Sequence, residues 1–114
     1  MEKVEGIGGI FFRARNPDEL TAWYRDMLGV GGEGYEPWQQ QAGPTVFTPF
    51  AQDTEYFGRP EQAWMINFRV RDLDAMVAQL TAAGIAVTTE TYSYGRFGRL
   101  HDPEGNPIEL WQPT

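Results

Sequence analysis

The chain has 114 residues, a length that suits a single small domain. Its formal net charge of −7 argues against binding to the phosphate backbone of nucleic acids, because such binding needs clustered Lys and Arg. It contains no cysteine, which excludes disulfides, thiolate nucleophiles and Cys-based metal sites.

The first residues, MEKVEGIGG, lack the basic and apolar pattern of a secretory signal. No apolar run approaches the ~18 residues that a membrane span requires. We therefore expect a cytoplasmic protein that has neither a membrane nor a nucleic acid as its partner.

The first half of the chain predicts a strand over residues 9–15 and then a helix. Asn16 is a good helix cap and Pro17 fits the first helical position, so the helix is expected to begin there. Apolar residues recur at helical spacing until Gly29, which is expected to end the helix. Beyond it we expect at most a short strand over 35–39, and a strand over 45–50.

The second half follows a segment, residues 51–62, that has turn residues and no clear period. We interpret this segment as a linker. A helix is predicted from near Asp72 to Gly84. The predicted strands of this half cover residues 64–71, 85–91, 97–102 and 107–112.

The last two predicted strands are joined by the sequence Asp-Pro-Glu-Gly, residues 102–105, which is typical of a type I turn. The strand after the turn alternates aliphatic side chains with Glu109 and Trp111, the pattern of a half-buried strand. One face is therefore expected to lie in the core, and the other to carry a carboxylate beside an indole.

The two halves have related sequences. Residues 11–23 align with residues 67–79, and both copies read as strand, acidic helix start, helix, glycine stop and next strand. The aligned identities include Phe12 with Phe68, Arg13 with Arg69 and Arg15 with Arg71. We therefore predict a duplicated βαβββ module within one domain: module 1 over about 7–50, a linker over 51–62, and module 2 over about 63–113.

Two motifs, AWYRDMLGV at residues 22–30 and LHDPEGNPIELWQ at residues 100–112, resemble the vicinal oxygen chelate superfamily. This superfamily contains glyoxalases, extradiol dioxygenases, fosfomycin-resistance enzymes and bleomycin-resistance proteins. The resemblance implies an α+β fold of the glyoxalase/bleomycin-resistance type, in which two βαβββ modules form an open curved-sheet barrel. It also implies a ligand site on the concave face and a homodimer.

The resemblance further implies where a divalent metal would bind. Metal-dependent members place His, Glu or Gln at equivalent positions of the two modules, which here are Gly9, Thr45, Met65 and Glu109. Glycine offers no side chain, and a thioether suits soft copper. One carboxylate cannot build a tetrahedral or octahedral site. We therefore expect no metal and no other cofactor.

Strand alternation predicts which side chains face the concave side, and a tyrosine-rich loop over residues 91–99 is expected to form its rim. The face combines apolar walls with a few polar groups, as small-molecule pockets do. The predicted ligand-binding residues are Phe11, Arg13, Phe47, Met65, Asn67, Arg69, Tyr94, Glu109 and Trp111.

Several roles are open for these residues. Glu109 can form an ion pair with Arg13 or Arg69, contact a ligand, or act as a general base. The two arginines can clamp a carboxylate or phosphate, or be packing relics of the duplication. The aromatic residues Phe47, Trp64 and Trp111 can stack on a planar ligand or fill the core.

We interpret the chain as a small-molecule-binding protein that holds an aromatic or cationic compound in a concave pocket without a catalytic metal. The alternative is an enzyme of the same superfamily, a glyoxalase-like lyase or isomerase or a dioxygenase. Its weak catalytic candidates are Glu109, the single histidine His101, and Tyr92. A further alternative is a regulatory or scaffold domain whose own aromatic side chains fill the concave face.

Overall fold

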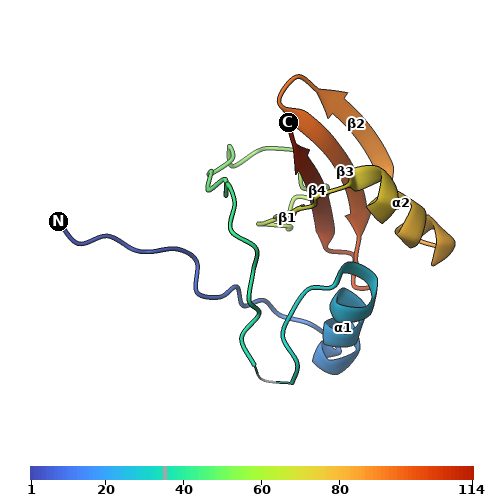
Figure 1. Cartoon of the computed structure of the whole chain (residues 1–114), viewed down its shortest axis with the longest axis horizontal. Coiled ribbons are helices and arrows are strands. Elements are labelled where there is room, and N and C mark those ends of the chain that lie inside the picture. Colours follow the sequence, from blue (N-terminus) through green and yellow to red (C-terminus); the bar gives the residue numbers. More distant parts are fainter. Residues whose placement is uncertain (35) are drawn as a thin grey trace.

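The computed structural model describes residues 1–34 and 36–114. It is built on a mixed four-stranded sheet in the order β1-β4-β3-β2 (Figure 1). β1 is parallel to β4, and the other neighbouring pairs are antiparallel. The strands are β1 (Ile66–Arg69), β2 (Thr88–Tyr92), β3 (Gly95–His101) and β4 (Pro107–Pro113). The sheet is open, and β4 lies inside it between β1 and β3.

α2 (Leu73–Ala82) connects β1 to β2 and packs on β3 and β4. It begins as predicted, because the Asp72 side chain accepts a hydrogen bond from the backbone N–H of Ala75 at 3.0 Å. The predicted module 2 is therefore present as β1, α2, β2, β3 and β4. Its strand boundaries differ from the expected ones by a few residues, and the α+β class is confirmed.

α1 (Pro17–Trp23) also begins as predicted, with the Asn16 side chain accepting a hydrogen bond from the backbone N–H of Glu19 at 3.2 Å. It continues as a π-helical turn, η1 (Tyr24–Leu28). The turn ends at Gly29, which has a φ of 68° that glycine adopts without strain.

The core lies on one face of the sheet, between the strands and the helical segments. Ile108 and Leu110 of β4 are buried there, whereas Glu109 and Trp111 point to the opposite face, as the alternation predicted. The buried apolar cluster consists of Leu20, Tyr24, Leu73, Leu80, Leu100, Ile108 and Leu110. Among the described residues, no helix is long and apolar enough to cross a bilayer.

The strands predicted for module 1 are wrong. Within the described residues, neither 9–15 nor 45–50 forms a strand, and residues 36–39 form none either. Tyr35, which begins the short strand expected over 35–39, lies outside the described residues. A strand needs paired neighbours, and two strands alone are marginal in water. At the place where module 2 has its central strands, the first half has a glycine-rich stretch. The strand-like segments of the first half therefore have no neighbouring strands to pair with among the described residues.

The turn after β3 connects the two halves of the chain. The Asp102 carboxylate accepts backbone hydrogen bonds from Glu104 at 2.8 Å and Asn106 at 3.0 Å, as expected for the first turn position. Asp102 also accepts a hydrogen bond from the Tyr24 hydroxyl at 2.7 Å. The Glu104 carboxylate accepts the backbone N–H of Arg15 at 2.6 Å, just before α1 begins. The two superfamily motifs are thus in direct contact.

Candidate functional site

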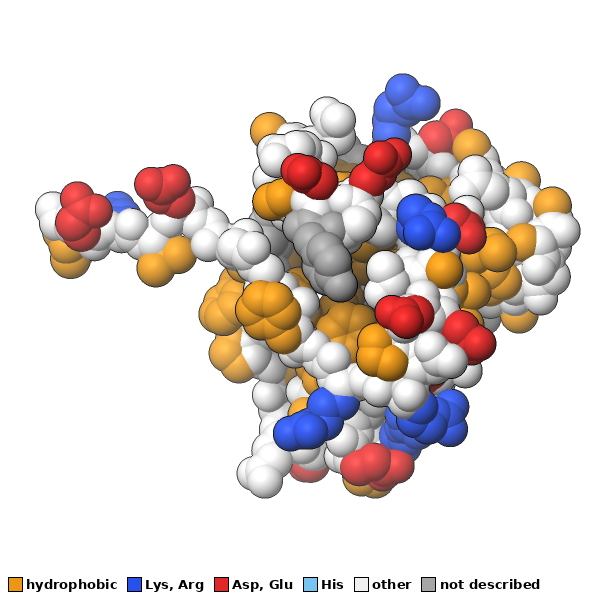
Figure 2. All heavy atoms as spheres, turned by 90° about the horizontal axis from the view of Figure 1, so that it is seen from below, with side chains coloured by type: hydrophobic (Ala, Val, Ile, Leu, Met, Phe, Trp, Pro, Cys, Tyr) orange, Lys and Arg blue, Asp and Glu red, His pale blue; other side chains and the backbone are white. Residues whose placement is uncertain are grey.

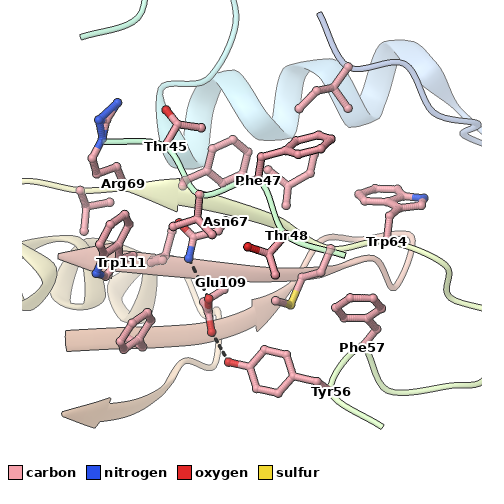
Figure 3. A pocket seen from close by; sticks show the side chains of 18 of the residues that line it. Thr45, Phe47, Thr48, Tyr56, Phe57, Trp64, Asn67, Arg69, Glu109 and Trp111 are labelled. Atoms are coloured by element: carbon pink, nitrogen blue, oxygen red, sulfur yellow. Dashed lines mark hydrogen bonds between the residues drawn. The ribbon is translucent and has the colours of Figure 1, made fainter. Parts of the chain in front are cut away.

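A large hollow lies along the β1 side of the sheet, and its lining includes Glu109 and Trp111 on one face as well as Met76 and Gln79 of α2. Its floor is formed by β1 and β4, and its walls come from the extended segments of the first half and from residues 51–58 (Figure 3). The hollow measures about 2240 Å³, against roughly 300–1,000 Å³ for a typical ligand pocket. It therefore has more room than one small ligand fills.

Glu109 lies at the centre of this hollow and is only 8% exposed. Its Oε1 accepts a hydrogen bond from Asn67 Nδ2 at 2.7 Å, and its Oε2 accepts one from the Tyr56 hydroxyl (Figure 3). Neither Arg13 nor Arg69 forms an ion pair with it in the described part of the chain. A carboxylate has about four acceptor positions, so Glu109 keeps acceptor capacity for a ligand.

Tyr56 is the functional candidate that sequence reasoning missed. It belongs to the segment interpreted as a linker, yet its hydroxyl reaches Glu109 and its ring packs under Arg99, whose Cζ is 4.1 Å from the ring centroid. Burial raises the pKa of Tyr56 above its usual value, and the hydrogen bond to Glu109 raises it further. Tyr56 therefore stays protonated and donates to the carboxylate.

The signals that could have found this group were the aromatic pair Tyr56-Phe57 in an otherwise polar segment, and the position of Arg99. Arg99 is the direct cross-strand neighbour of Glu109, so it lies beside the carboxylate.

Aromatic side chains form a second part of the wall. Phe97 and Trp111 are cross-strand neighbours whose rings are nearly parallel, with centroids 6.4 Å apart. At the tip of the β2–β3 hairpin, Tyr92 and Tyr94 stack with centroids 5.4 Å apart and both contact Phe97 edge-on. These rings give the hollow a preformed surface for a flat apolar group.

The predicted ligand-binding residues are placed as follows. Arg13 does not line the hollow. The other predicted residues, Phe11, Phe47, Met65, Asn67, Arg69, Tyr94, Glu109 and Trp111, do line it. Among the catalytic candidates, Tyr92 lines it, but its hydroxyl donates to Glu90. His101 is exposed and lines a separate, smaller hollow beside Trp23. The structure therefore does not bring His101 and Glu109 together.

The residues present do not fit a divalent metal. Gly9, Thr45 and Met65 all line the hollow with Glu109, but only Glu109 offers a carboxylate. Within residues 1–34 and 36–114, no three His, Cys, Asp or Glu side chains are grouped so that they could hold a metal ion. Hard and borderline cations need several oxygen or nitrogen ligands.

The family model of the glyoxalase-like domain matches residues 9–111. The chain belongs to the glyoxalase-like domain family. This match includes the extended segments of the first half as well as the sheet. It agrees with the superfamily that the two sequence motifs resemble.

Two curated relatives match much of this glyoxalase-like chain. CFP32 of Mycobacterium bovis, named as a candidate glyoxylase, is 32% identical over an alignment of 108 positions, which covers 86% of this chain and 40% of that protein. The biphenyl-2,3-diol 1,2-dioxygenase of Sphingomonas paucimobilis is 28% identical over an alignment of 127 positions, which covers 97% of this chain and 40% of that protein. The chain thus spans about two fifths of the length of these relatives.

Solved structures share the fold. The antibiotic-binding protein TnmS3 from Streptomyces sp. CB03234 has a TM-score of 0.66 and 21% identity, with 100% of each chain covered. A lactoylglutathione lyase from Agrobacterium tumefaciens has a TM-score of 0.63 and 20% identity, covering 97% of this chain and 96% of that one. At these identities the likeness establishes the glyoxalase/bleomycin-resistance-type fold, and it does not choose between binding and catalysis.

Proposed function

We propose that this glyoxalase-like domain binds a small aromatic or cationic molecule in the hollow above β1 and β4, without a catalytic metal. The observation that carries the proposal is Glu109, a buried carboxylate held by Asn67 and Tyr56 in a site walled by aromatic rings. Apolar walls with a few convergent polar groups are the usual composition of a small-molecule site. The negative charge of the chain also favours the approach of a cation.

The enzyme alternative has less support from the geometry. A general acid–base pair needs both groups within hydrogen-bond reach of one substrate, and His101 lies at a different hollow from Glu109. The donor set at Gly9, Thr45, Met65 and Glu109 does not supply a Lewis acid site. Binding requires neither of these features.

Replacing Glu109 by Gln tests the proposal, because it removes the charge while keeping the shape. We expect the affinity for the planar cation N-methylquinolinium to fall by at least about tenfold, since the variant loses the coulombic attraction of the carboxylate, which is about 4 kcal/mol for unit charges about 4 Å apart at an effective dielectric constant of about 20 and is partly offset by desolvation. Affinity for neutral quinoline should change little. Isothermal titration calorimetry measures both, and Glu61→Gln is the charge-matched control on the surface.

Two results would contradict the proposal. One is a Glu109→Gln variant that loses stability but binds the cation as the unaltered protein does, which would make Glu109 structural. The other is about one tightly held divalent metal per chain in elemental analysis of the same preparation, which would contradict the metal-free site.

We also propose that the chain acts as a homodimer. Phe11 is 95% exposed and Phe47 is 86% exposed, on extended segments that pair with nothing in the described chain. Figure 2 shows hydrophobic side chains exposed along the N-terminal extension and on the surface beside it. The size of the hollow leaves space for protein atoms from a second copy. Apolar surface of this kind is typical of interaction sites.

Sedimentation velocity is expected to give about twice the chain mass of 12.9 kDa. Phe11→Glu should shift the protein toward the monomer, because it places a charge where an apolar contact is proposed. Ala78→Glu, at an exposed apolar residue on α2 that lies away from these segments, is the control. A protein that sediments as a single chain at micromolar concentration would contradict the dimer.

A further inference from the structure

Tyr56 is held in the hollow by three different contacts to its side chain. The hydroxyl donates to Glu109 Oε2, and the Arg99 guanidinium lies over the ring. The third contact comes from Phe50, whose ring stacks on Tyr56 with centroids 5.7 Å apart and an interplanar angle of 24°. An acceptor, a cation and an aromatic ring thus surround one phenol group (Figure 3 shows its contact with Glu109).

The segment that carries Tyr56 is weakly attached to the rest of the molecule. Residues 51–58 contain neither helix nor strand, and their backbone hydrogen bonds are local turns such as Thr54 N–H to Ala51 O at 3.0 Å. Within the described residues, the hydrogen bonds that join this segment to the rest of the chain are Tyr56 to Glu109 and Arg99 to the Tyr56 carbonyl. Both are made by Tyr56, and its side chain is 37% exposed.

Segments with few buried contacts and few long-range hydrogen bonds open at low free-energy cost. Removing Tyr56 from Glu109 would leave the buried carboxylate with Asn67 as its remaining hydrogen-bond donor, so the vacated position favours another donor. Arg99 and the aromatic side chains of the wall would still border this vacated position.

We propose that Tyr56 is an internal occupant of the ligand position, and that the ligand which displaces it is a small phenol, an aromatic ring that carries a hydroxyl group. The phenol hydroxyl then donates to Glu109, and Arg99 covers the ring as it covers that of Tyr56. Binding releases residues 51–58 from the sheet. This inference rests on the proposed function and names the ligand class of the same site.

An internal occupant lowers the apparent affinity by the fraction of molecules in which the site is free. Removing the occupant therefore strengthens binding. We expect Tyr56→Ala to bind p-cresol, the side-chain analogue of tyrosine, about 10- to 100-fold more tightly than the unaltered chain does. Tyr56→Phe keeps the ring but loses the bond to Glu109, so it should give a smaller gain. Glu61→Ala, at an exposed residue just beyond this segment that does not line the hollow, should leave the affinity unchanged.

Calorimetric titration with p-cresol measures these affinities, and toluene shows the contribution of the hydroxyl group. Tyr56→Ala is expected to increase the affinity for toluene much less than the affinity for p-cresol. In the unaltered chain, saturating p-cresol should accelerate cleavage by the Glu-specific protease after Glu55, read by mass spectrometry, because the segment is released.

The inference is overturned if neither Tyr56→Ala nor Tyr56→Phe binds p-cresol more tightly than the unaltered chain does. It is also overturned if Tyr56→Ala increases the affinity for toluene as much as the affinity for p-cresol. If Tyr56→Ala fails to fold, Tyr56→Phe and the protease assay on the unaltered chain still decide it. The two proposals can fail separately. If the Tyr56 variants bind p-cresol no more tightly, but N-methylquinolinium still binds and its binding still depends on Glu109, then Tyr56 is not an internal occupant and the proposed function stands.

Discussion

Asp102→Ala is expected to lower the free energy of unfolding by about 3–5 kcal/mol, the largest effect of any single change proposed for this chain. The Asp102 side chain is 4% exposed and accepts hydrogen bonds from Tyr24, from Glu104 and from Asn106, which donates with both its backbone and its side chain. Removing the acceptor leaves the buried Tyr24 hydroxyl and the partly buried donors of Glu104 and Asn106 without a partner, and an unsatisfied buried group costs roughly 1–3 kcal/mol.

Urea denaturation followed by circular dichroism measures this loss. Tyr24→Phe removes one donor and leaves the carboxylate in place, so it should cost only about 1–2 kcal/mol. Glu2→Ala, on the exposed N-terminal extension, should change stability by less than about 0.5 kcal/mol. An Asp102→Ala variant with a loss below 1 kcal/mol would mean that water replaces the carboxylate and that the turn does not depend on it.

Gly95→Ala is expected to disturb the aromatic wall of the hollow. A Cβ atom at this position would lie 2.5 Å from Nε1 and 2.9 Å from Cδ1 of Trp111. The indole cannot simply move away, because it is stacked against Phe97. Overpacking of this kind typically costs about 1–3 kcal/mol. We also expect weaker binding of N-methylquinolinium, since the displaced indole changes the wall on which a flat ligand stacks.

Tryptophan fluorescence and urea denaturation together test this expectation. Because the chain has four tryptophans, a shift of the emission maximum that is absent in a Trp111→Phe background would report the displaced indole, and the denaturation midpoint would report the cost in stability. Gly8→Ala is the matched control, because a Cβ there meets nothing within 4 Å. If Gly95→Ala and Gly8→Ala had the same stability and the same emission, the close approach of Gly95 to Trp111 would have no energetic consequence.

The features that the sequence predicted well are local ones. The cap at Asn16, the end of the helix at Gly29 and the turn at Asp102 each depend on a few neighbouring residues. The alternation along β4 was also predictable, because a half-buried strand has a period of two whatever its neighbours are. This local information was sufficient for module 2 and for the position of Glu109.

The features that the sequence did not predict are non-local. Residues 9–15 and 45–50 have a strand-like pattern, but a strand also needs partners, and pairing cannot be inferred from the segment itself. Tyr56 was missed because its segment has no period, and its contact with Glu109 spans 53 residues of sequence. Arg99 was treated as a rim residue, although the cross-strand register places it beside Glu109.

The bond between the Tyr24 hydroxyl and Asp102 also has a consequence for folding kinetics. These residues are 78 positions apart in the chain, and the contact of Arg15 with Glu104 spans 89 positions. The β2–β3–β4 meander closes only short loops, so we expect it to form before α1 docks, because docking of α1 requires a much longer loop to close. Insertions into residues 51–62 therefore slow the docking of α1 more than they weaken the folded state, because closure entropy rises only by about 0.6 kcal/mol per doubling of loop length.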